Sequence, residues 1–331
     1  MNPKSYPFLK EPTAITNQHW DDDVPALLSI VNNTYNHENF ISETIEGFLK
    51  QKTTFKVEIL VHDDASTDNT ATIIREYEKK YPELILPIYQ TTNQYSQGIN
   101  PNREFQFPRI KGQYIAICEG DDYWTNPLKL QKQVEFLEQN LSYSLSWCRF
   151  KTLNEDTGEF NNDKNENLFE EGDVSVDFDF ERFYKGWHIG TQTLVYRKSM
   201  FDSNIYSIYK YTRDIHVVSH LLQKGKGVCL NFFGAVYRKH EGGIYSSLSI
   251  IQNAKTGYLC YKELYENNIQ VVFLQLKYIK FTKIYIRVLV KNSKYKEAFQ
   301  KSYEIFMINK DLQYFLKSVK AIVFQNPKYL K

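Results

Sequence analysis

The sequence predicts a mostly parallel, doubly wound α/β sheet with helices on both faces, followed by a helical C-terminal extension. In the first half, short apolar runs typical of buried strands alternate with helical spacing of apolar residues. From about residue 250 onward the pattern is mostly helical and basic. The chain has 331 residues, which exceeds the usual size of one domain, so a large domain with an appendage is the expected organisation.

The expected elements follow in chain order from these patterns. Pro127 suits the first turn of a helix that carries Leu130, Val134 and Leu137 on one face, and another helix opens at Asp214. The polar, acidic residues 154–179 are expected to form a surface excursion. The expected strands cover residues 26–31, 55–62, 83–89, 114–118, 192–197 and 227–237, and further helices are expected over about 40–49 and 66–77.

Composition excludes several classes of protein. The net charge is +2, but residues 261–331 carry 14 basic and 5 acidic side chains, so a basic tail follows an acidic body. The four cysteines show no CxxC spacing and lie beside apolar stretches, which favours reduced core thiols. Residues 271–290 are apolar but contain four basic residues, so a transmembrane helix is not predicted, and we expect a cytoplasmic protein.

Three polar clusters directly follow expected strands, at residues 33–36, 63–64 and 119–122. The carboxyl ends of parallel strands meet at one edge of a sheet, so these clusters are expected along one rim. The sequence has neither GxGxxG nor GxxxxGK[ST], which argues against a dinucleotide oxidoreductase and a P-loop NTPase. A divalent cation held by carboxylates would neutralise a diphosphate without such a loop.

These motifs resemble those of a known family. SIVNNTYN, HDDASTDNT and EGDD are similar to the strand-end motifs of inverting family-2 glycosyltransferases with the GT-A fold, and EGDDYWTNPLKLQKQ resembles a bacterial subgroup that makes surface polysaccharides. The resemblance covers about residues 25–245. It implies a nucleoside-diphosphate sugar donor, usually linked to UDP. The family commonly has glycine where Ala65 stands, and its Ala-Arg-Asn signature is replaced here by residues 102–104.

The resemblance implies a nucleotide pocket at these motifs. Asp64 would accept a hydrogen bond from the pyrimidine imide, and Asp121 would face the ribose. Asp122 would bind a Mn²⁺ or Mg²⁺ ion that bridges the two phosphates, and Glu119 would support it on the diphosphate side. The residues expected to bind the nucleotide are Thr34, Tyr35, Asn36, Asp63, Asp64, Arg103 and Asp121.

The second half would supply the acceptor side and the catalytic base. Residues 187–192 resemble the acceptor-side segment of the family, which points to Thr191 and Gln192 on the acceptor or diphosphate side. Asp214 matches the catalytic base of the family; a helix cap is the alternative for this residue. YRKHEGG at 237–243 resembles the segment that closes the site, where Arg238 would neutralise the diphosphate and His240 would bind the metal or the diphosphate. The remaining histidines are interpreted as structural.

We therefore expect a tail over residues 1–23, a GT-A domain over 24–250 and a basic helical extension over 251–331. Within the domain, residues 24–140 would form the nucleotide-sugar half and 141–250 the acceptor half. The expected activity is metal-dependent transfer of a sugar, with inversion, to a saccharide or lipid-linked saccharide. The alternatives are a sugar-phosphate nucleotidyltransferase and a non-catalytic nucleotide-sugar-binding module.

No nucleic-acid partner is expected, because the basic residues lie outside the motifs. For the extension, two interpretations stay open. Val272, Leu276, Ile279, Ile284 and Leu289 interleave with basic residues, as on a helix that lies at the inner face of a membrane. The other interpretation is a helical cap packed on the domain.

Overall fold

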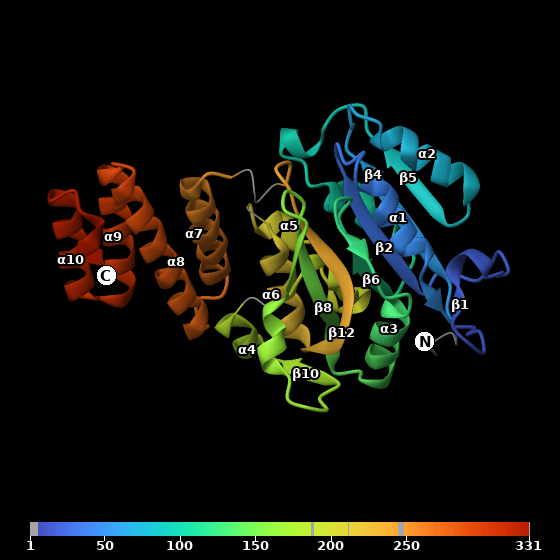
Figure 1. Ribbon diagram of the computed structural model, residues 1–331. Coiled ribbons are helices and arrows are strands. Elements are labelled where there is room, and N and C mark those ends of the chain that lie inside the picture. Colours follow the sequence, from blue (N-terminus) through green and yellow to red (C-terminus); the bar gives the residue numbers. More distant parts are fainter. Residues whose placement is uncertain (1–5, 187–188, 211, 244–247, 331) are drawn as a thin grey trace. The chain divides into compact units, whose positions relative to one another are not determined.

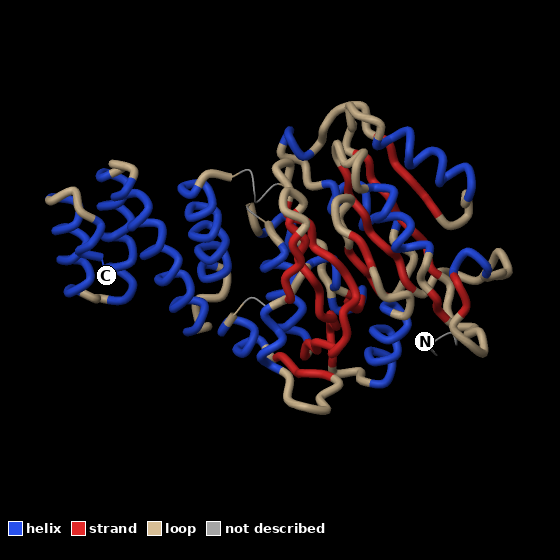
Figure 2. Tube along the Cα trace, in the orientation of Figure 1, coloured by secondary structure: helices blue, strands red, loops and turns tan. Residues whose placement is uncertain are grey.

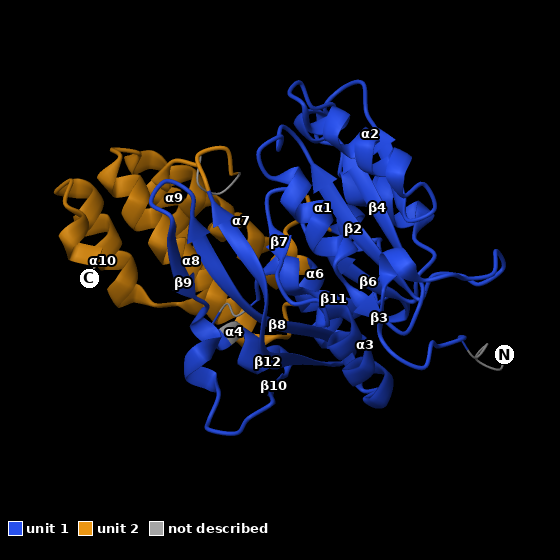
Figure 3. Cartoon of the chain, turned by 45° about the vertical axis from the view of Figure 1, so that its right-hand side comes forward, with its two compact units in different colours: residues 1–208, 217–239 blue, residues 209–216, 240–331 orange. Residues whose placement is uncertain are grey.

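The computed structural model of the chain describes residues 6–186, 189–210, 212–243 and 248–330. These fall into two compact units (Figure 3). Unit 1 consists of residues 1–208 and 217–239, and unit 2 of residues 209–216 and 240–331.

Unit 1 is built on a large mixed sheet (Figures 1 and 2). Its main path runs β10-β12-β8-β11-β6-β2-β4-β5, with β7 paired to β12 and β9 to β8. The strands of the sheet are β2 (Leu28–Thr34), β4 (Val57–Asp63), β5 (Ile85–Tyr89), β6 (Tyr114–Ile117), β7 (Tyr123–Trp124), β8 (Tyr143–Asn154), β9 (Glu159–Asn162), β10 (Ser175–Phe178), β11 (Val195–Arg197) and β12 (Lys226–Lys239).

The half of the sheet that contains β5, β4, β2 and β6 is entirely parallel. Every residue of β4 is buried, because helices cover the faces of a parallel sheet and leave no solvated side. This confirms the expected parallel α/β architecture. The helices of this region are α1 (Ile41–Leu49), α2 (Thr70–Lys80) and α3 (Lys129–Gln139), and later in the chain come α4 (Phe180–Lys185), α5 (Ile205–Ile208) and α6 (Asp214–Lys224).

The other half of the sheet is mixed. The short strand β11 runs antiparallel to both β6 and β8, whereas β8 and β12 are parallel. The sequence analysis did not predict β8, because the buried Ser144, Ser146 and Arg149 interrupt its apolar pattern. Ser144 Oγ donates to the Lys226 carbonyl (3.2 Å), and Arg149 Nε lies 3.5 Å from Asp163 Oδ2.

Residues 154–179, expected to form a surface excursion, are mostly exposed and contain two short strands. β9 extends the sheet by pairing with β8, and β10 pairs with β12. All four residues of β9 are exposed, whereas in β10 the buried Val176 and Phe178 alternate with Ser175 and Asp177, so neither strand shows a continuous apolar run. Near the N-terminus, β1 (Thr13–Ala14) pairs with β3 (Lys52–Thr53) in a separate two-stranded sheet.

Unit 2 is mostly helical, as the sequence predicts. It contains α7 (Ile250–Glu266), α8 (Val272–Lys291), α9 (Tyr295–Asn309) and α10 (Leu312–Val323). Its apolar core includes Ile286, Leu289, Ile305 and Ala321. A capping box between Ser249 and Gln252 begins α7. Among the described helices of the chain, none has the length and apolar character needed to cross a bilayer.

Unit 2 differs in extent from the expected extension of residues 251–331. It begins at residue 240 and takes in residues 209–216, which include the first turn of α6. Contacts with Glu263 on α7 hold this segment: the Lys210 amide donates to Glu263 Oε1 (3.0 Å), and His216 Nε2 lies 3.7 Å from Glu263 Oε2.

Candidate functional site

Three polar segments meet at the carboxyl edge of the parallel strands. Thr34 and Asp63, the last residues of β2 and β4, are register partners. The Asp64 amide donates to the Thr34 carbonyl (3.0 Å), and the Gly120 amide donates to the Asn33 carbonyl (2.9 Å). The strand-end clusters therefore share one rim, as the alternation of strands and helices predicts.

Asp63 and Asp64 lie side by side on this rim in different environments. Both oxygens of Asp64 accept backbone amides of a neighbouring loop, from Gln94 (2.8 Å) and Tyr95 (3.0 Å). Asp64 therefore positions the loop after β5. Burial raises the pKa of Asp63, and the nearby carboxylates of Asp68 and Asp64 add to the effect, against hydrogen bonds from Ser66. Asp63 Oδ1 is buried and has no hydrogen-bond partner within the described part of the chain.

The segment after β2 begins the predicted base pocket. Tyr35 is 42% exposed, which leaves its ring accessible at the rim. Asn36 adopts a left-handed conformation with φ of 54°. Its Oδ1 accepts the Thr67 amide (2.8 Å) and its own amide donates to Ser66 Oγ (2.9 Å). Asn36 thus joins the loops after β2 and β4.

The acidic loop after β6 carries strong negative charge at low exposure. Asp122 is only 4% exposed, and its Oδ1 accepts the backbone amide of Arg238 (2.8 Å). Burial raises the pKa of Asp122 well above its usual value, and the charges of Asp121 and Glu119 raise it further. A cation at this loop would relieve that repulsion.

Arg238 supports the acidic loop from β12. Its guanidinium donates to Glu155 Oε1 (2.7 Å), to the Asp121 carbonyl (2.9 Å) and to Glu43 Oε2, and it lies over the Tyr123 ring. Protein acceptors therefore occupy its nitrogens in this structure, and the neutralisation of a diphosphate by Arg238 stays a prediction. The side chain ties the end of β12 to the loop.

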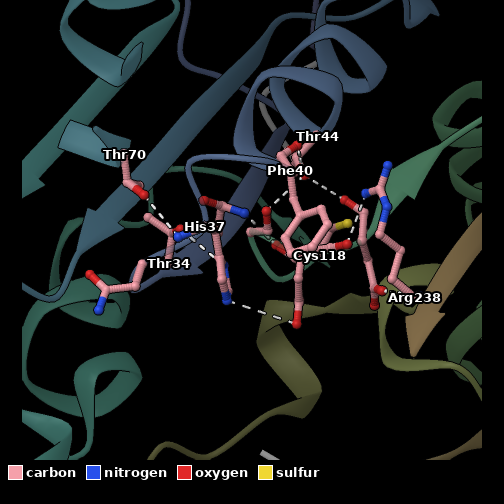
Figure 4. A network of polar contacts seen from close by, with 12 residues as sticks. Thr34, His37, Phe40, Thr44, Thr70, Cys118 and Arg238 are labelled. Carbon is pink, nitrogen blue, oxygen red and sulfur yellow. Dashed lines mark hydrogen bonds and ion pairs between the residues drawn. The ribbon is translucent and has the colours of Figure 1, made fainter. Parts of the chain in front are cut away.

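His37 belongs to the site, although the sequence analysis interpreted it as structural. Its Nδ1 lies 3.1 Å from Thr34 Oγ1, and its Nε2 lies 3.9 Å from Asp121 Oδ2. Figure 4 shows Thr34, His37 and Thr70 on one side of this network and Arg238 on the other. The TYNH spacing, which returns His37 towards Thr34, was the available signal. A Cβ on Gly120 would come within 2.4 Å of Thr34 Oγ1 and 2.8 Å of His37 Nδ1, so only glycine fits there.

The segment proposed to replace the Ala-Arg-Asn signature forms a π-helical turn, η3 (Asn102–Gln106). Asn102 Oδ1 accepts Asn33 Nδ2 at the rim (2.9 Å). Arg103 is largely exposed and its Nε lies 3.2 Å from Glu104 Oε1. Asn102 thus contacts the strand end, as does Gln106, whose Nε2 donates to the Asn32 carbonyl (2.7 Å).

On the predicted acceptor side, the structure describes Thr191 and Gln192, which form the short helical turn η6 (Thr191–Thr193), but Trp187 and His188 lie outside the described residues. The Gln192 carbonyl accepts Trp124 Nε1 (2.6 Å). Gln192 Nε2 is buried and has no hydrogen-bond partner among the residues described. Gln192 therefore offers an unpaired donor.

Asp214 and His240 belong to unit 2. Asp214 is the exposed first residue of α6, where the helix dipole stabilises an ionised carboxylate. Its charge acts on Cys260 of α7, whose pKa is raised to about 12, mainly by burial. His240 follows the last residue of β12, and its carbonyl accepts the Gly243 amide (3.2 Å).

No group of three or more His, Cys, Asp or Glu side chains converges on one point within the described ranges. The acidic loop nevertheless suits a cation chemically, because Asp122 is a buried oxygen donor beside two further carboxylates.

The parallel sheet with polar clusters at its carboxyl edge places the protein in the class of open α/β folds, whose ligands bind at that edge. A family model described as "Glycosyl transferase family 2" matches residues 29–211. The chain belongs to this family.

Two relatives among curated proteins illustrate the range of similarity. The chain is 37% identical over 224 residues to an uncharacterised protein of Mycobacterium tuberculosis, a match that covers 66% of this chain and 61% of that protein. The chain thus spans about three fifths of that relative. It is 35% identical over 113 residues to an Escherichia coli protein named UDP-Glc:alpha-D-GlcNAc-diphosphoundecaprenol beta-1,3-glucosyltransferase WfaP, covering 34% of this chain and 41% of that one.

Two solved structures share the fold. Staphylococcus aureus TarS 1-349, determined with UDP-GlcNAc, superposes with a TM-score of 0.59 at 16% identity and covers 92% of this chain and 90% of that one. The mannosyltransferase PcManGT of Pyrobaculum calidifontis, determined with GDP-Man and Mn²⁺, has a TM-score of 0.50 at 13% identity and covers 96% and 89%. These matches establish the GT-A fold, with helices α7–α10 following the sheet.

Proposed function

We propose that the protein transfers a sugar from a nucleoside-diphosphate donor, UDP-linked as the sequence motifs imply, to a hydroxyl of a saccharide or lipid-linked saccharide. The observation that carries this proposal is the rim itself: Asp63, Asp64, Asp121 and Asp122 stand at neighbouring parallel strand ends in a chain of family 2. Structural relatives were determined with nucleotide-sugars, which supports the donor class.

The donor nucleotide would lie over the ends of β2 and β4. Tyr35 offers an exposed ring for stacking with a base. Asp64 presents carboxylate oxygens that already hold the loop at residues 94–95, so the pocket wall is prepared before the base arrives. Asp121, held near His37, would accept a ribose hydroxyl.

A Mn²⁺ or Mg²⁺ ion would be held by Asp122, with His240 as a further proposed ligand. The excess negative charge on the acidic loop and the Mn²⁺ in the structure of PcManGT support this assignment. When bound, such an ion supplies electrostatic stabilisation of the departing diphosphate. Arg238 contributes indirectly, by keeping the loop in place through the Asp121 carbonyl and Asp122.

Asp214 is the proposed catalytic base. Exposed at the N-terminus of α6, it would take the proton of the acceptor hydroxyl as that oxygen attacks the anomeric carbon. The bond from the sugar to the nucleoside diphosphate breaks on the opposite face, which inverts the anomeric configuration.

The acceptor class rests on relatives. The name of the E. coli relative specifies a diphosphoundecaprenol-linked acceptor, and we propose a saccharide or lipid-linked saccharide of surface-polysaccharide synthesis for this chain. The cytoplasmic location at the inner face of the membrane stays a prediction.

A donor screen tests the proposal. UDP-, GDP- and dTDP-sugars are incubated with the protein and Mn²⁺ or Mg²⁺, and release of nucleoside diphosphate is measured with and without saccharide acceptors. Asp214→Asn is nearly isosteric and should lower the transfer rate by about 10²–10⁴-fold while leaving nucleotide binding intact.

Asp179→Asn is the matched control, because Asp179 also begins a helix and accepts the Arg182 amide (2.6 Å). It should leave transfer unchanged. Nucleotide-sugar binding without release by the unmodified protein would favour a non-catalytic binding module. Near-normal transfer by Asp214→Asn would assign the base elsewhere, with Glu241 as the next candidate.

A further inference from the structure

One face of α8 presents apolar and basic side chains to solvent in alternation. We call Val272, Leu276, Lys280, Ile284 and Arg287 the α8 face; they are spaced three or four residues apart and so lie on one side of the helix. Val272, Leu276 and Ile284 are 66%, 61% and 42% exposed. Ile279 and Leu289, which the sequence analysis placed in the same stripe, are 8% and 0% exposed and belong to the interior of unit 2.

A shallow groove of about 370 Å³ runs along this face. Residues of α8 form its floor, and Tyr314 and Leu330 form its other side. Lys283 Nζ lies 4.0 Å from the centroid of the Tyr314 ring. Tyr314 Oη is buried, and the described residues provide it with no hydrogen-bond partner. The groove thus combines cations with apolar walls.

The described residues that line the groove include three basic side chains, Lys280, Lys283 and Arg287, and no acidic one. Glu297 accepts the Tyr285 hydroxyl (2.6 Å), and Glu304 contacts Lys301 Nζ (2.8 Å). Asp311 caps α10 through the Tyr314 amide and lies 3.5 Å from Lys283 Nζ. Lys280 and Arg287 stay exposed on the α8 face.

We propose that the α8 face docks on the surface of a membrane that contains anionic phospholipid. Headgroup phosphates would lie against Lys280, Lys283 and Arg287, while Leu276 and Ile284 enter the interfacial layer. Charge complementarity favours this partner, because each basic residue near an anionic surface strengthens the electrostatic attraction to the membrane. Apolar side chains that are buried in the interfacial layer strengthen binding further. The docking itself does not depend on glycosyl transfer, whereas its use, access to a lipid-linked acceptor, rests on the proposed function.

Vesicle flotation of the full chain tests the proposal without any donor or acceptor. Vesicles of phosphatidylcholine alone are compared with vesicles that contain 30% phosphatidylglycerol as a chosen probe composition, on the order of a physiological anionic fraction. We expect binding only to the anionic vesicles, decreasing with added salt. The double variant Lys280→Gln/Arg287→Gln should reduce partitioning by ~30-fold, and Leu276→Gln/Ile284→Gln by ~10-fold or more.

Two matched variants of unit 1 serve as controls. Lys50→Gln/Lys79→Gln removes two exposed lysines, and Leu141→Gln/Val174→Gln removes two exposed apolar residues. Neither should change flotation. Circular dichroism confirms that each variant is folded. Equal flotation with both vesicle types, or flotation unaffected by the α8 apolar variant, would overturn the proposal; the latter result would indicate adsorption of a basic protein by charge alone.

Discussion

Ala65 occupies a conformation that favours glycine. It follows Asp64 with φ of 63°, in the left-handed region where the Cβ of an L-residue is crowded. Asn36, across the rim, has a similar φ of 54°, but its side chain is bonded to the Thr67 amide. The methyl side chain of Ala65 cannot form a hydrogen bond of this kind, so no side-chain contact offsets the backbone strain at this position.

Replacing Ala65 by glycine should therefore stabilise unit 1. Relief of about 1–2 kcal/mol of left-handed strain outweighs about 0.5–1 kcal/mol of added entropy in the unfolded chain. We expect the free energy of unfolding to rise by about 0.5–1 kcal/mol in a urea titration. Ala71→Gly, within α2, is the control and should lower it by about 1 kcal/mol. A loss of stability in Ala65→Gly would contradict the strain argument.

Replacement of Asp122 should weaken the binding of UDP in the presence of Mn²⁺ or Mg²⁺. Asp122→Asn keeps an oxygen to accept the Arg238 amide but removes the charge, so the loop should stay in place. With Mn²⁺ or Mg²⁺ present, we expect UDP to bind at least about tenfold more weakly to the variant than to the unmodified protein.

Isothermal titration calorimetry with and without EDTA measures this effect. Asp156→Asn, on an exposed turn, is the control for loss of one carboxylate. Equal affinity of the unmodified protein with and without metal would show that Asp122 holds no ion needed for nucleotide binding.

At the scale of elements, the carboxylate of Glu304 connects several helices of unit 2 through hydrogen bonds with tyrosine hydroxyls. Glu304 on α9 accepts the hydroxyls of Tyr258 on α7 (3.0 Å) and Tyr278 on α8, and it pairs with Lys262 (3.1 Å) and Lys301 (2.8 Å). One side chain therefore links three helices. Burial by itself raises the pKa of Glu304, but the hydrogen bonds from Lys301 and Tyr278 outweigh it and lower the pKa to about 2.

Glu304→Gln should destabilise unit 2, because the amide preserves the shape of the side chain but removes the negative charge that pairs with Lys262 and Lys301. We expect a decrease of about 1–3 kcal/mol in the free energy of unfolding, measured from helical circular dichroism in urea. Glu266→Gln on α7 is the matched control. The Glu266 carboxylate is mostly exposed and forms one surface ion pair, with Lys262 Nζ at 3.7 Å. Its replacement should change the free energy of unfolding by less than about 0.5 kcal/mol. Equal effects of the two substitutions would argue against the network.

At the scale of the whole molecule, acid should weaken unit 2. Burial lowers the pKa of His216 to about 4, so the folded state loses stability as pH falls from about 6.5 towards 4. The depressed pKa of Glu304 stabilises the fold above about pH 4.5, and this contribution is lost as pH falls towards 2. Both groups belong to unit 2.

The four tryptophans, residues 20, 124, 147 and 187, fall in the sequence range of unit 1. We therefore expect helical circular dichroism to decline at higher pH than tryptophan emission in an acid titration. His216→Gln should remove the part of this loss above pH 4. Coincident transitions at every pH would mean that these two groups do not set the acid stability of unit 2.

The parallel half of the sheet and the rim were predictable from local pattern. β6 is a continuous apolar run, and β2 and β4 are mostly apolar in their first halves, with polar residues gathered at their carboxyl ends. β8 was not predictable in this way, since its buried Ser144 and Arg149 contact segments elsewhere in the chain, at Lys226 and Asp163. Short exposed strands such as β9 exist only because β8 offers an edge to pair with.

The sequence by itself determined the family motifs, the parallel core and the position of each acidic pair at a strand end, because these depend on residues close together in the chain. Only the tertiary structure decided what those residues contact. In the folded chain, Arg238 donates to Glu43, Glu155 and the acidic loop, and His37 lies near Asp121. On α8, Ile279 is buried whereas Leu276 is exposed to solvent. The physical reason is that hydrogen bonding and burial are satisfied between segments far apart in the chain, and local spacing carries no information about those partners.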